Sequence, residues 1–198
     1  LLERSISIGL LENAQQLGQR LAQLSAELLV EALPRIETAG TGPEAERIAR
    51  LGVRVQGEVG LSYARMLTKD DLLVNWNQSA LEIHRRVMGL YPGAVTQWQG
   101  KRLKLLATEP LVARLATQLS PEARYLLAEP GVFSKGALSA TAAPGTVLAL
   151  AADAGLVVGT AGCPLLIRAA QLEGKSPAQG QSLLQQLGCS AGDQLGIT

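Results

Sequence analysis

Apolar residues recur with helical spacing near the start of the chain. Four leucines follow one another at intervals of four, three and four residues, namely Leu17, Leu21, Leu24 and Leu28. This spacing places them on one face of a helix, and Asn13 is a suitable N-cap. We expect the helix to cover residues 14–33 and to kink or end at Pro34, with Gly40 as a natural stop. Before it, the alternation of residues 5–8 predicts a short strand. One strand and one helix cannot bury this apolar stripe. We expect another part of the protein to cover it, either the later domain or, as the favoured interpretation, a sheet outside this chain.

A second amphipathic pattern begins in the middle of the chain. Ser79 and Glu82 have the spacing of a capping box, in which two side chains satisfy the first free amides of a helix. The residues expected on the buried face of that helix are Ala80, Ile83, Val87 and Leu90. Two strands should follow at residues 95–98 and 103–107, joined by a tight turn at Gln99-Gly100.

The last third alternates between segments rich in Ala and Leu and short strand patterns. Residues 111–143 contain a helix start at Ser120-Pro121 and are expected to form a long surface excursion. Strands are expected at residues 146–150, 156–159 and 165–172. Ser176-Pro177 predicts the start of a final helix that ends at Gly188. Several short strands at close spacing predict a small barrel or sandwich, and five strands with an early helix fit an OB-like barrel.

Composition places the chain among ordinary globular proteins. Its 198 residues suit one or two domains, and a hydrophobic content of 47% excludes a disordered chain. Aromatic residues make up only 3%, which argues against base stacking as the main mode of nucleic-acid binding. Because we find no long apolar run and no signal peptide, we expect a cytoplasmic protein. The chain begins at Leu1 inside a structured pattern, and we take it to be a fragment.

Charge is distributed unevenly along the chain. The total of +1 argues against a general nucleic-acid binder, but residues 1–40 carry a net −2, residues 41–110 a net +3 and residues 111–198 no net charge. Between Ile83 and Thr108 there is no acid, and the basic side chains there are His84, Arg85, Arg86, Lys101, Arg102 and Lys104. Basic residues usually only solvate a face, yet such a one-signed run suggests an anionic partner.

Residues 40–57 have the composition of a linker, with glycine and proline near their start. Arg47, Arg50 and Arg54 fall at spacings of three and four, so they would share one face if this segment were helical. From the residues alone, a solvated connector is the favoured interpretation.

No recognisable catalytic motif is present in the sequence. His84 has no acid or nucleophile near it in sequence, and we expect a surface or half-buried histidine. Asp70-Asp71 are typical of a turn rather than of an acid pair, and Cys163 and Cys189 have neither metal-binding nor redox spacing. The two cysteines fit a reducing compartment. No catalytic residue and no metal site are therefore predicted for this chain.

Short segments with characteristic spacing run through the middle and the end of the chain. They are Tyr63-Ala64-Arg65-Met66-Leu67, Val74-Asn75-Trp76, residues 83–89, Tyr91-Pro92-Gly93-Ala94, residues 100–106, Pro144-Gly145-Thr146-Val147 and Gln171-Leu172-Glu173-Gly174-Lys175. In this order they resemble the C-terminal domain of the methionyl-tRNA formyltransferase family. Residues 6–36 are similar to the last strand and helix of that family's catalytic domain, and residues 112–142 have no counterpart.

The resemblance implies a mixed α/β fragment in three parts. Residues 1–40 would be the last strand and helix of a Rossmann-like formyltransferase domain, and residues 41–57 a basic linker. Residues 58–198 would be a C-terminal OB-like β-barrel with flanking helices and an insertion at about 111–143. In the family, formyl transfer depends on an Asn, a His and an Asp of the N-terminal half, and no position here matches them. The isolated chain is therefore expected to be inactive.

The resemblance also implies a reaction and a partner. The full-length enzyme would transfer the formyl group of its co-substrate 10-formyltetrahydrofolate to methionyl-initiator-tRNA in translation initiation, and would act as a monomer. In the family, the linker and the C-terminal barrel lie along the tRNA backbone, so this chain would bind tRNA and no cofactor. The candidate tRNA-binding residues are Arg47, Arg50, Arg54, Arg65, Lys69, Arg85, Arg86, Lys101, Arg102, Lys104 and Lys175.

Three positions depart from the family pattern, and two other functions stay open. Met88 and Ser176 stand where the family usually has basic residues, and Arg65 replaces the usual Lys. These changes suggest that the domain binds tRNA more weakly, or that part of the tRNA binding is shifted to the linker. One alternative is a sibling formyltransferase that acts on an amino sugar or hydrolyses formyltetrahydrofolate. The basic linker and hairpin favour tRNA over these substrates. The other alternative is a stand-alone OB-like RNA-binding module without catalysis. The apolar stripe of the helix at residues 14–33 argues against it, because that stripe needs a sheet to cover it.

Overall fold

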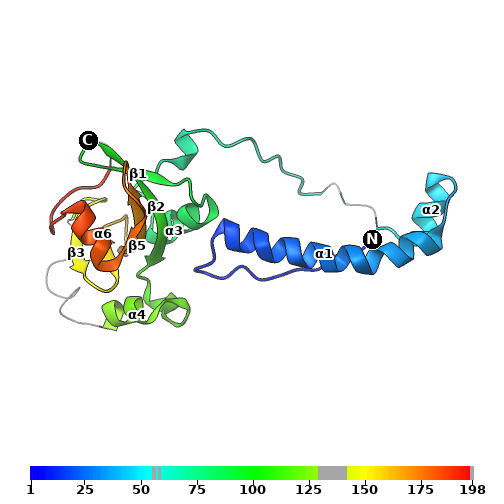
Figure 1. The fold of residues 1–198 in the computed structure, drawn as a ribbon, viewed down its shortest axis with the longest axis horizontal. Helices are drawn as coiled ribbons and strands as arrows, with labels where there is room; N and C mark the ends of the chain where they lie inside the picture. Colours follow the sequence, from blue (N-terminus) through cyan, green and yellow to red (C-terminus); the bar gives the residue numbers. More distant parts are fainter. Residues whose placement is uncertain (55–56, 58, 129–141, 197–198) are drawn as a thin grey trace. The chain divides into compact units, whose positions relative to one another are not determined.

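The structure is a computed structural model that describes residues 1–54, 57, 59–128 and 142–196 (Figure 1). The chain divides into two compact units. We call Leu1–Ile8 with Gln15–Met66 the helical unit, and Gly9–Ala14 with Leu67–Thr198 the sheet unit. The short segment before residue 15 therefore belongs to a unit that is otherwise built from the second two thirds of the chain.

The helical unit is formed mainly by a long helix, α1 (Ala14–Ala39), and a short helix, α2 (Glu44–Leu51). Helix α1 does not end at Pro34, where an end or a kink was expected, but continues to Ala39. Proline obstructs only the turn before it and lacks one N–H, so the following residues can still form helical hydrogen bonds. The expected stop at Gly40 is confirmed by its φ of 64°, a left-handed conformation that glycine adopts without strain.

The strand expected at residues 5–8 is not formed. Its neighbours are side chains of α1 instead: Arg4 makes a 2.7 Å ion pair with Glu31, and Arg20 donates to the carbonyl of Ser7. An alternating pattern becomes a strand only where another backbone offers hydrogen bonds. The described residues of the helical unit offer helices but no strand.

The described residues of the sheet unit form six antiparallel strands in one sheet (Figure 1). They are β1 (Val95–Trp98), β2 (Lys101–Pro110), β3 (Val147–Ala151), β4 (Gly155–Val158), β5 (Leu165–Leu172) and β6 (Ala178–Gln179). The order is β1-β2-β5-β4-β3, and β6 pairs with β5 beside this path. Among the described residues no ladder joins β1 to β3, so the strand pairing does not close the sheet.

The hairpin between β1 and β2 has the expected turn. Gln99 and Gly100 have φ angles of 48° and 75°, and Trp98 pairs with Lys101 across the turn. Two successive residues with positive φ give the turn a twist that matches the flanking strands. The turn therefore fixes the register that places each side chain of β2 on one face or the other.

Helices of the sheet unit begin largely where their caps predict. The α-helices are α3 (Ala80–Gly89), α4 (Pro121–Ala128) and α6 (Gly180–Leu187), and the 3-10 helices are η1 (Asp70–Leu72) and η2 (Ala113–Gln118). Ser79 and Glu82 form the complete capping box, and hydrogen bonds from Ser79 lower the pKa of the Glu82 carboxyl. Ser120 caps α4 as expected. The prediction that the last helix starts at Ser176-Pro177 is wrong, because Ala178–Gln179 pair with β5 before the helix begins.

The two faces of the sheet carry two separate apolar cores. One core lies under α3 and α6, where Ile83, Leu103 and Leu183 are fully buried. The other lies on the opposite face, where Leu126 of α4 packs with Leu166 of β5. The described part of the expected surface excursion, residues 111–128, thus covers a sheet face.

A buried ion pair ties this second layer to the sheet. The Glu109 side chain is only 1% exposed and accepts hydrogen bonds from the Ser120 amide and the Arg168 guanidinium, both at 2.8 Å. The second terminal nitrogen of Arg168, Nη2, lies 3.4 Å from Oε2 of Glu122. Removing one partner of such a pair leaves a buried charge without compensation.

We predict that Arg168→Met lowers the free energy of unfolding by about 2–3 kcal/mol, because Glu109 keeps its burial but loses its cation. Urea unfolding followed by circular dichroism measures this change. Arg114→Met, at an exposed arginine of η2, is the matched control and should change stability by less than about 0.5 kcal/mol. Equal effects of the two substitutions would contradict the assigned role of the pair.

Candidate nucleic-acid interface

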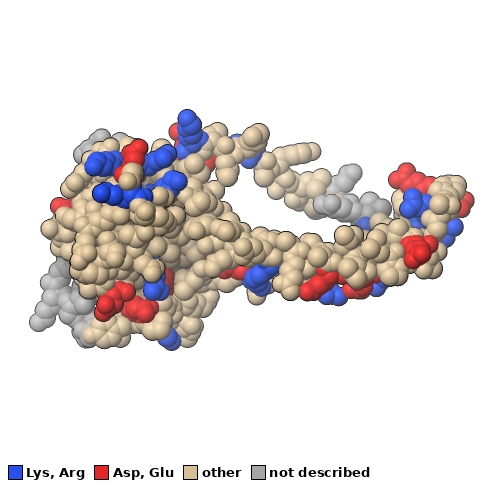
Figure 2. Space-filling model, viewed as in Figure 1, with Lys and Arg blue, Asp and Glu red and all other residues tan. Residues whose placement is uncertain are grey.

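Four cationic residues lie at one end of the sheet, and we call them the basic edge. They are Lys101, Arg102 and Lys104 of β2 and Lys175 of the turn between β5 and β6. Backbone pairing brings the two segments together: Lys104 lies opposite Gln171, and the Glu173 amide donates to the Arg102 carbonyl at 2.9 Å. Figure 2 shows lysine and arginine side chains gathered over the part of the sheet unit where β1 and β2 lie.

The alternation of β2 directs its charges away from the core. Leu103 and Leu105 are fully buried, so Arg102 and Lys104 lie on the opposite face of the strand. Lys101 lies on the face of Leu103 and is exposed because it stands at the end of the hairpin. The turn places Lys175 next to this row, since Gln171 donates its side-chain amide to the Lys175 carbonyl.

An acidic side chain close to these cations, that of Glu173, is held by the backbone. Glu173 accepts a hydrogen bond from the Arg102 amide at 3.1 Å. Within the described ranges, none of the four cations of the basic edge takes part in an ion pair. Their charge is therefore available to a partner in solution, and such a cluster suits phosphates, which bind Lys and Arg with little regard to sequence.

Three further candidates also belong to the sheet unit. Arg86 of α3 donates to the carbonyl of Asp71 at 2.7 Å, while Arg85 is exposed on the same helix. Lys69 is exposed just before η1. The following segment pairs with β1, since the Val74 amide donates to the Val95 carbonyl at 2.9 Å. The segment that follows Lys69 and η1 thus lies beside the first strand of the hairpin.

The remaining four candidates belong to the helical unit. Arg47 and Arg50 lie on α2, but Arg54 lies beyond the left-handed Gly52 that ends this helix, so the three arginines do not form one helical face. Arg54 makes an exposed 3.0 Å ion pair with Glu3. Arg50 donates to the Thr41 carbonyl, and Arg65 donates to the carbonyl of Met66.

The expectation of a surface or half-buried His84 is wrong. The side chain is 1% exposed, with Nδ1 3.0 Å from Thr108 Oγ1 and Nε2 2.7 Å from the Leu10 carbonyl. Desolvation lowers the pKa of His84. His84 follows the buried Ile83, and Met88, four residues after His84, is also buried. The buried face of α3 is therefore wider than a single stripe. That broad face was the sequence signal for burial.

The other titratable side chains in the described parts of the chain lie outside the basic edge. No group of three or more His, Cys, Asp or Glu side chains in these parts could hold a metal ion. Cys163 is exposed and Cys189 buried, and both are free. Of the helices that the structure describes, none is both long and apolar enough to cross a membrane.

Comparison with known proteins identifies relatives across the whole chain. The family described as "Formyl transferase, C-terminal domain" matches residues 66–188. The chain is 59% identical over 197 residues to a methionyl-tRNA formyltransferase of Synechococcus sp. (strain WH7803), covering 100% of this chain and 55% of that protein. It is 57% identical over 187 residues to the methionyl-tRNA formyltransferase of Synechococcus sp. (strain RCC307), covering 94% of this chain and 54% of that protein. A relative of that name from Prochlorococcus marinus (strain MIT 9303) is 51% identical over 199 residues, covering 100% of this chain and 56% of the relative. The chain spans about half the length of the curated relatives it matches.

His84 is the one histidine of the chain, so its titration can be followed alone. Because burial lowers its pKa in the folded state, the unfolded state binds the proton more readily. We predict that stability falls as pH drops below about 6.5, the ordinary histidine value, and continues to fall until the folded-state pKa is passed. The decline should be smaller in His84→Gln, and urea unfolding at a series of pH values measures both. An NMR titration of the imidazole that gave an ordinary or raised pKa would contradict this assignment.

Proposed function

The chain belongs to the formyl transferases that carry this C-terminal domain, and from that membership we propose that it is the tRNA-holding part of a methionyl-tRNA formyltransferase. The observation that carries the proposal is the identity of 59% to a protein of that name over essentially the full chain. The basic edge supports it, because a tRNA-holding surface needs lysine and arginine side chains that can reach phosphates.

We propose that the full-length protein uses 10-formyltetrahydrofolate as its one-carbon donor. The amine of the methionine on initiator tRNA would attack the formyl carbon, the bond from that carbon to the folate nitrogen would break, and the amine proton would pass to the folate product. This chain would contribute position rather than chemistry, because its one histidine is buried and paired. The isolated chain should therefore be inactive in formyl transfer.

The proposed division of the chain follows from the same role. Residues 1–40 would complete a Rossmann-like catalytic domain, residues 41–57 would form the basic linker, and residues 58–198 an OB-like domain. Exposed apolar side chains on α1 support the first part, among them Leu29 at 58% and Val30 at 68% exposure. The antiparallel sheet with an early helix supports the last part. The protein would act as a monomer in the cytoplasm.

The basic edge would bind tRNA through its phosphates. Residues two apart on a strand lie about 7 Å apart on one face, so Arg102 and Lys104 form a short cationic row. Each phosphate contact displaces condensed counterions, which makes affinity fall as salt rises. Such binding supplies affinity and orientation, while it leaves base identity to be read elsewhere in the full-length protein.

We predict that the triple substitution Lys101→Glu, Arg102→Glu and Lys175→Glu weakens initiator-tRNA binding more than tenfold at low salt. The slope of log affinity against log salt should flatten by about 2–3, close to one for each lost phosphate contact. Filter binding over a KCl series measures both quantities.

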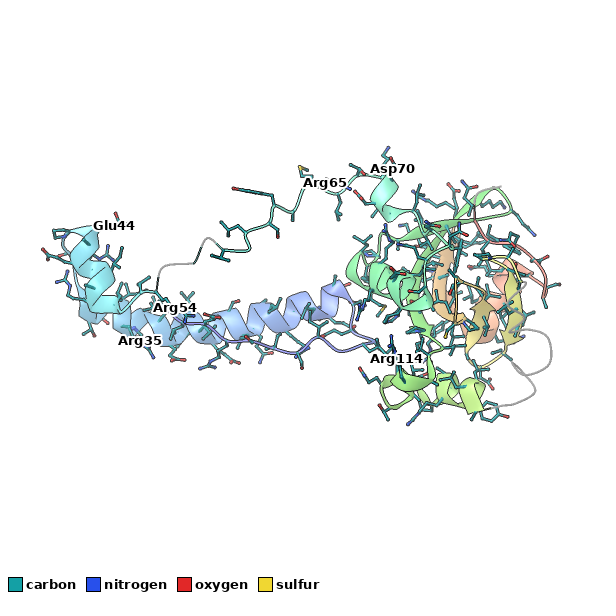
Figure 3. All side chains as sticks on the ribbon, turned by 180° about the vertical axis from the view of Figure 1, so that it is seen from behind. Arg35, Glu44, Arg54, Arg65, Asp70 and Arg114 are labelled. Carbon is teal, nitrogen blue, oxygen red and sulfur yellow. The ribbon has the colours of Figure 1, made fainter. Side chains whose placement is uncertain are left out.

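The matched control is Arg114→Glu with Arg124→Glu, which reverses two exposed arginines of η2 and α4. Figure 3 places Arg114 on the side of the sheet unit away from Asp70 and the 3-10 turn that precedes the hairpin. These changes should lower affinity less than threefold, through the altered net charge alone. If the control weakened binding as much as the triple substitution, the basic edge would not be the tRNA surface.

A further inference from the structure

A polar groove of about 490 Å³ lies in the sheet unit, apart from the basic edge. Residues 70 and 73–78 form part of its wall, Arg86 of α3 and Pro144 another part, and residues 194–196 the rest. Its size falls within the range of small-molecule sites in proteins. Asp70, labelled in Figure 3, belongs to this wall.

The wall is fixed by hydrogen bonds of its own. The Gln194 side chain donates to the Pro144 carbonyl at 2.6 Å and accepts from the Thr146 hydroxyl at 2.9 Å. Trp76 donates its indole N–H to Thr96 at 3.0 Å, and the Asn75 side chain accepts from the Asn77 amide. A groove whose walls are already ordered loses little entropy when a ligand enters.

One wall residue lacks a hydrogen bond that burial normally requires. The Oε1 atom of Gln78 is buried and accepts no hydrogen bond from any described residue, although the Gln78 carbonyl accepts from the Ala161 amide at 3.1 Å. A buried acceptor without a donor is unfavourable. Because Gln78 belongs to the wall, a ligand N–H that reached this amide oxygen would remove that cost.

Arg86 supplies a charge to the same groove. One arm of its guanidinium is anchored on the Asp71 carbonyl, and the group has five N–H donors in a planar fork. Its remaining donors suit a small anion such as a phosphate. Asp70 disfavours a second negative group but can accept hydrogen bonds from hydroxyls, so the ligand should combine one anion, hydroxyls and a planar N–H donor.

We infer that this groove binds one ribonucleotide, with its phosphate on Arg86, its ribose hydroxyls toward Asp70 and a base N–H on Gln78. The nucleotide could be free, or it could be an unpaired residue of an RNA. The second source rests on the proposed tRNA role, while the first does not.

The test is calorimetric titration of the 198-residue chain with AMP, CMP, GMP and UMP. At least one should bind with a Kd below about 1 mM, and its nucleoside and inorganic phosphate should each bind at least tenfold more weakly. Arg86→Met and Gln78→Leu should each weaken binding of that nucleotide about tenfold. Gln78→Leu should leave the urea concentration at the unfolding midpoint unchanged or raise it, because the substitution removes the unpaired acceptor. A residue with a purely structural role would instead lose stability.

The two sources are separated by tRNA binding. If the nucleotide belongs to RNA, Gln78→Leu weakens tRNA binding by the same factor as nucleotide binding, and if it is free, tRNA binding does not change. The Lys101→Glu, Arg102→Glu, Lys175→Glu protein should keep nucleotide binding in either case. If the unchanged chain bound a nucleotide but did not bind initiator tRNA, the tRNA role would be overturned and the groove would stand. No nucleotide binding up to about 10 mM, with Gln78→Leu indistinguishable from the unchanged chain toward tRNA, would overturn the groove.

Discussion

The pairing of β2 with β5 is the interaction on which the sheet unit depends. Leu103 lies opposite Leu172 at one end of this ladder, and Pro110 lies opposite Leu165 at the other. One face of the pair carries the core under α3 and α6, and the other carries the core under α4. The same register sets Lys104 beside Gln171 and the turn that holds Lys175. A shift by one residue would exchange the faces of β2, bury its cations and expose its leucines.

Local signals in the sequence predicted most elements of this unit. The capping box at Ser79, the turn at Gln99-Gly100 and the stop at Gly188 act within a few residues, and each is found where it was expected. The basic run of β2 was also visible, because alternation along a strand needs no knowledge of the partner strand. The proximity of Lys175 could not be derived in that way, since it depends on the pairing of β2 with β5.

The errors came from interactions between distant segments. His84 was expected near the surface, but Leu10 and Thr108, which lie 74 and 24 residues away, enclose it. Residues 5–8 had a strand pattern without a strand to pair with, and Ala178–Gln179 became a strand because β5 lay beside them. In each case tertiary contacts decided the outcome, and local periodicity does not reveal which distant segment supplies those contacts.

The hydrogen bond from His84 to the Leu10 carbonyl has a consequence for the covalent architecture. Residues 9–14 belong to the sheet unit, while the chain on both sides of them belongs to the helical unit. A proteolytic cut within residues 59–66 would therefore leave an N-terminal fragment that carries the Leu10 carbonyl bound by His84 and the partly buried Leu10 side chain packed on the core under α4. These contacts within one unit would then join two separate pieces of chain. In this respect the sheet unit behaves as a two-segment assembly.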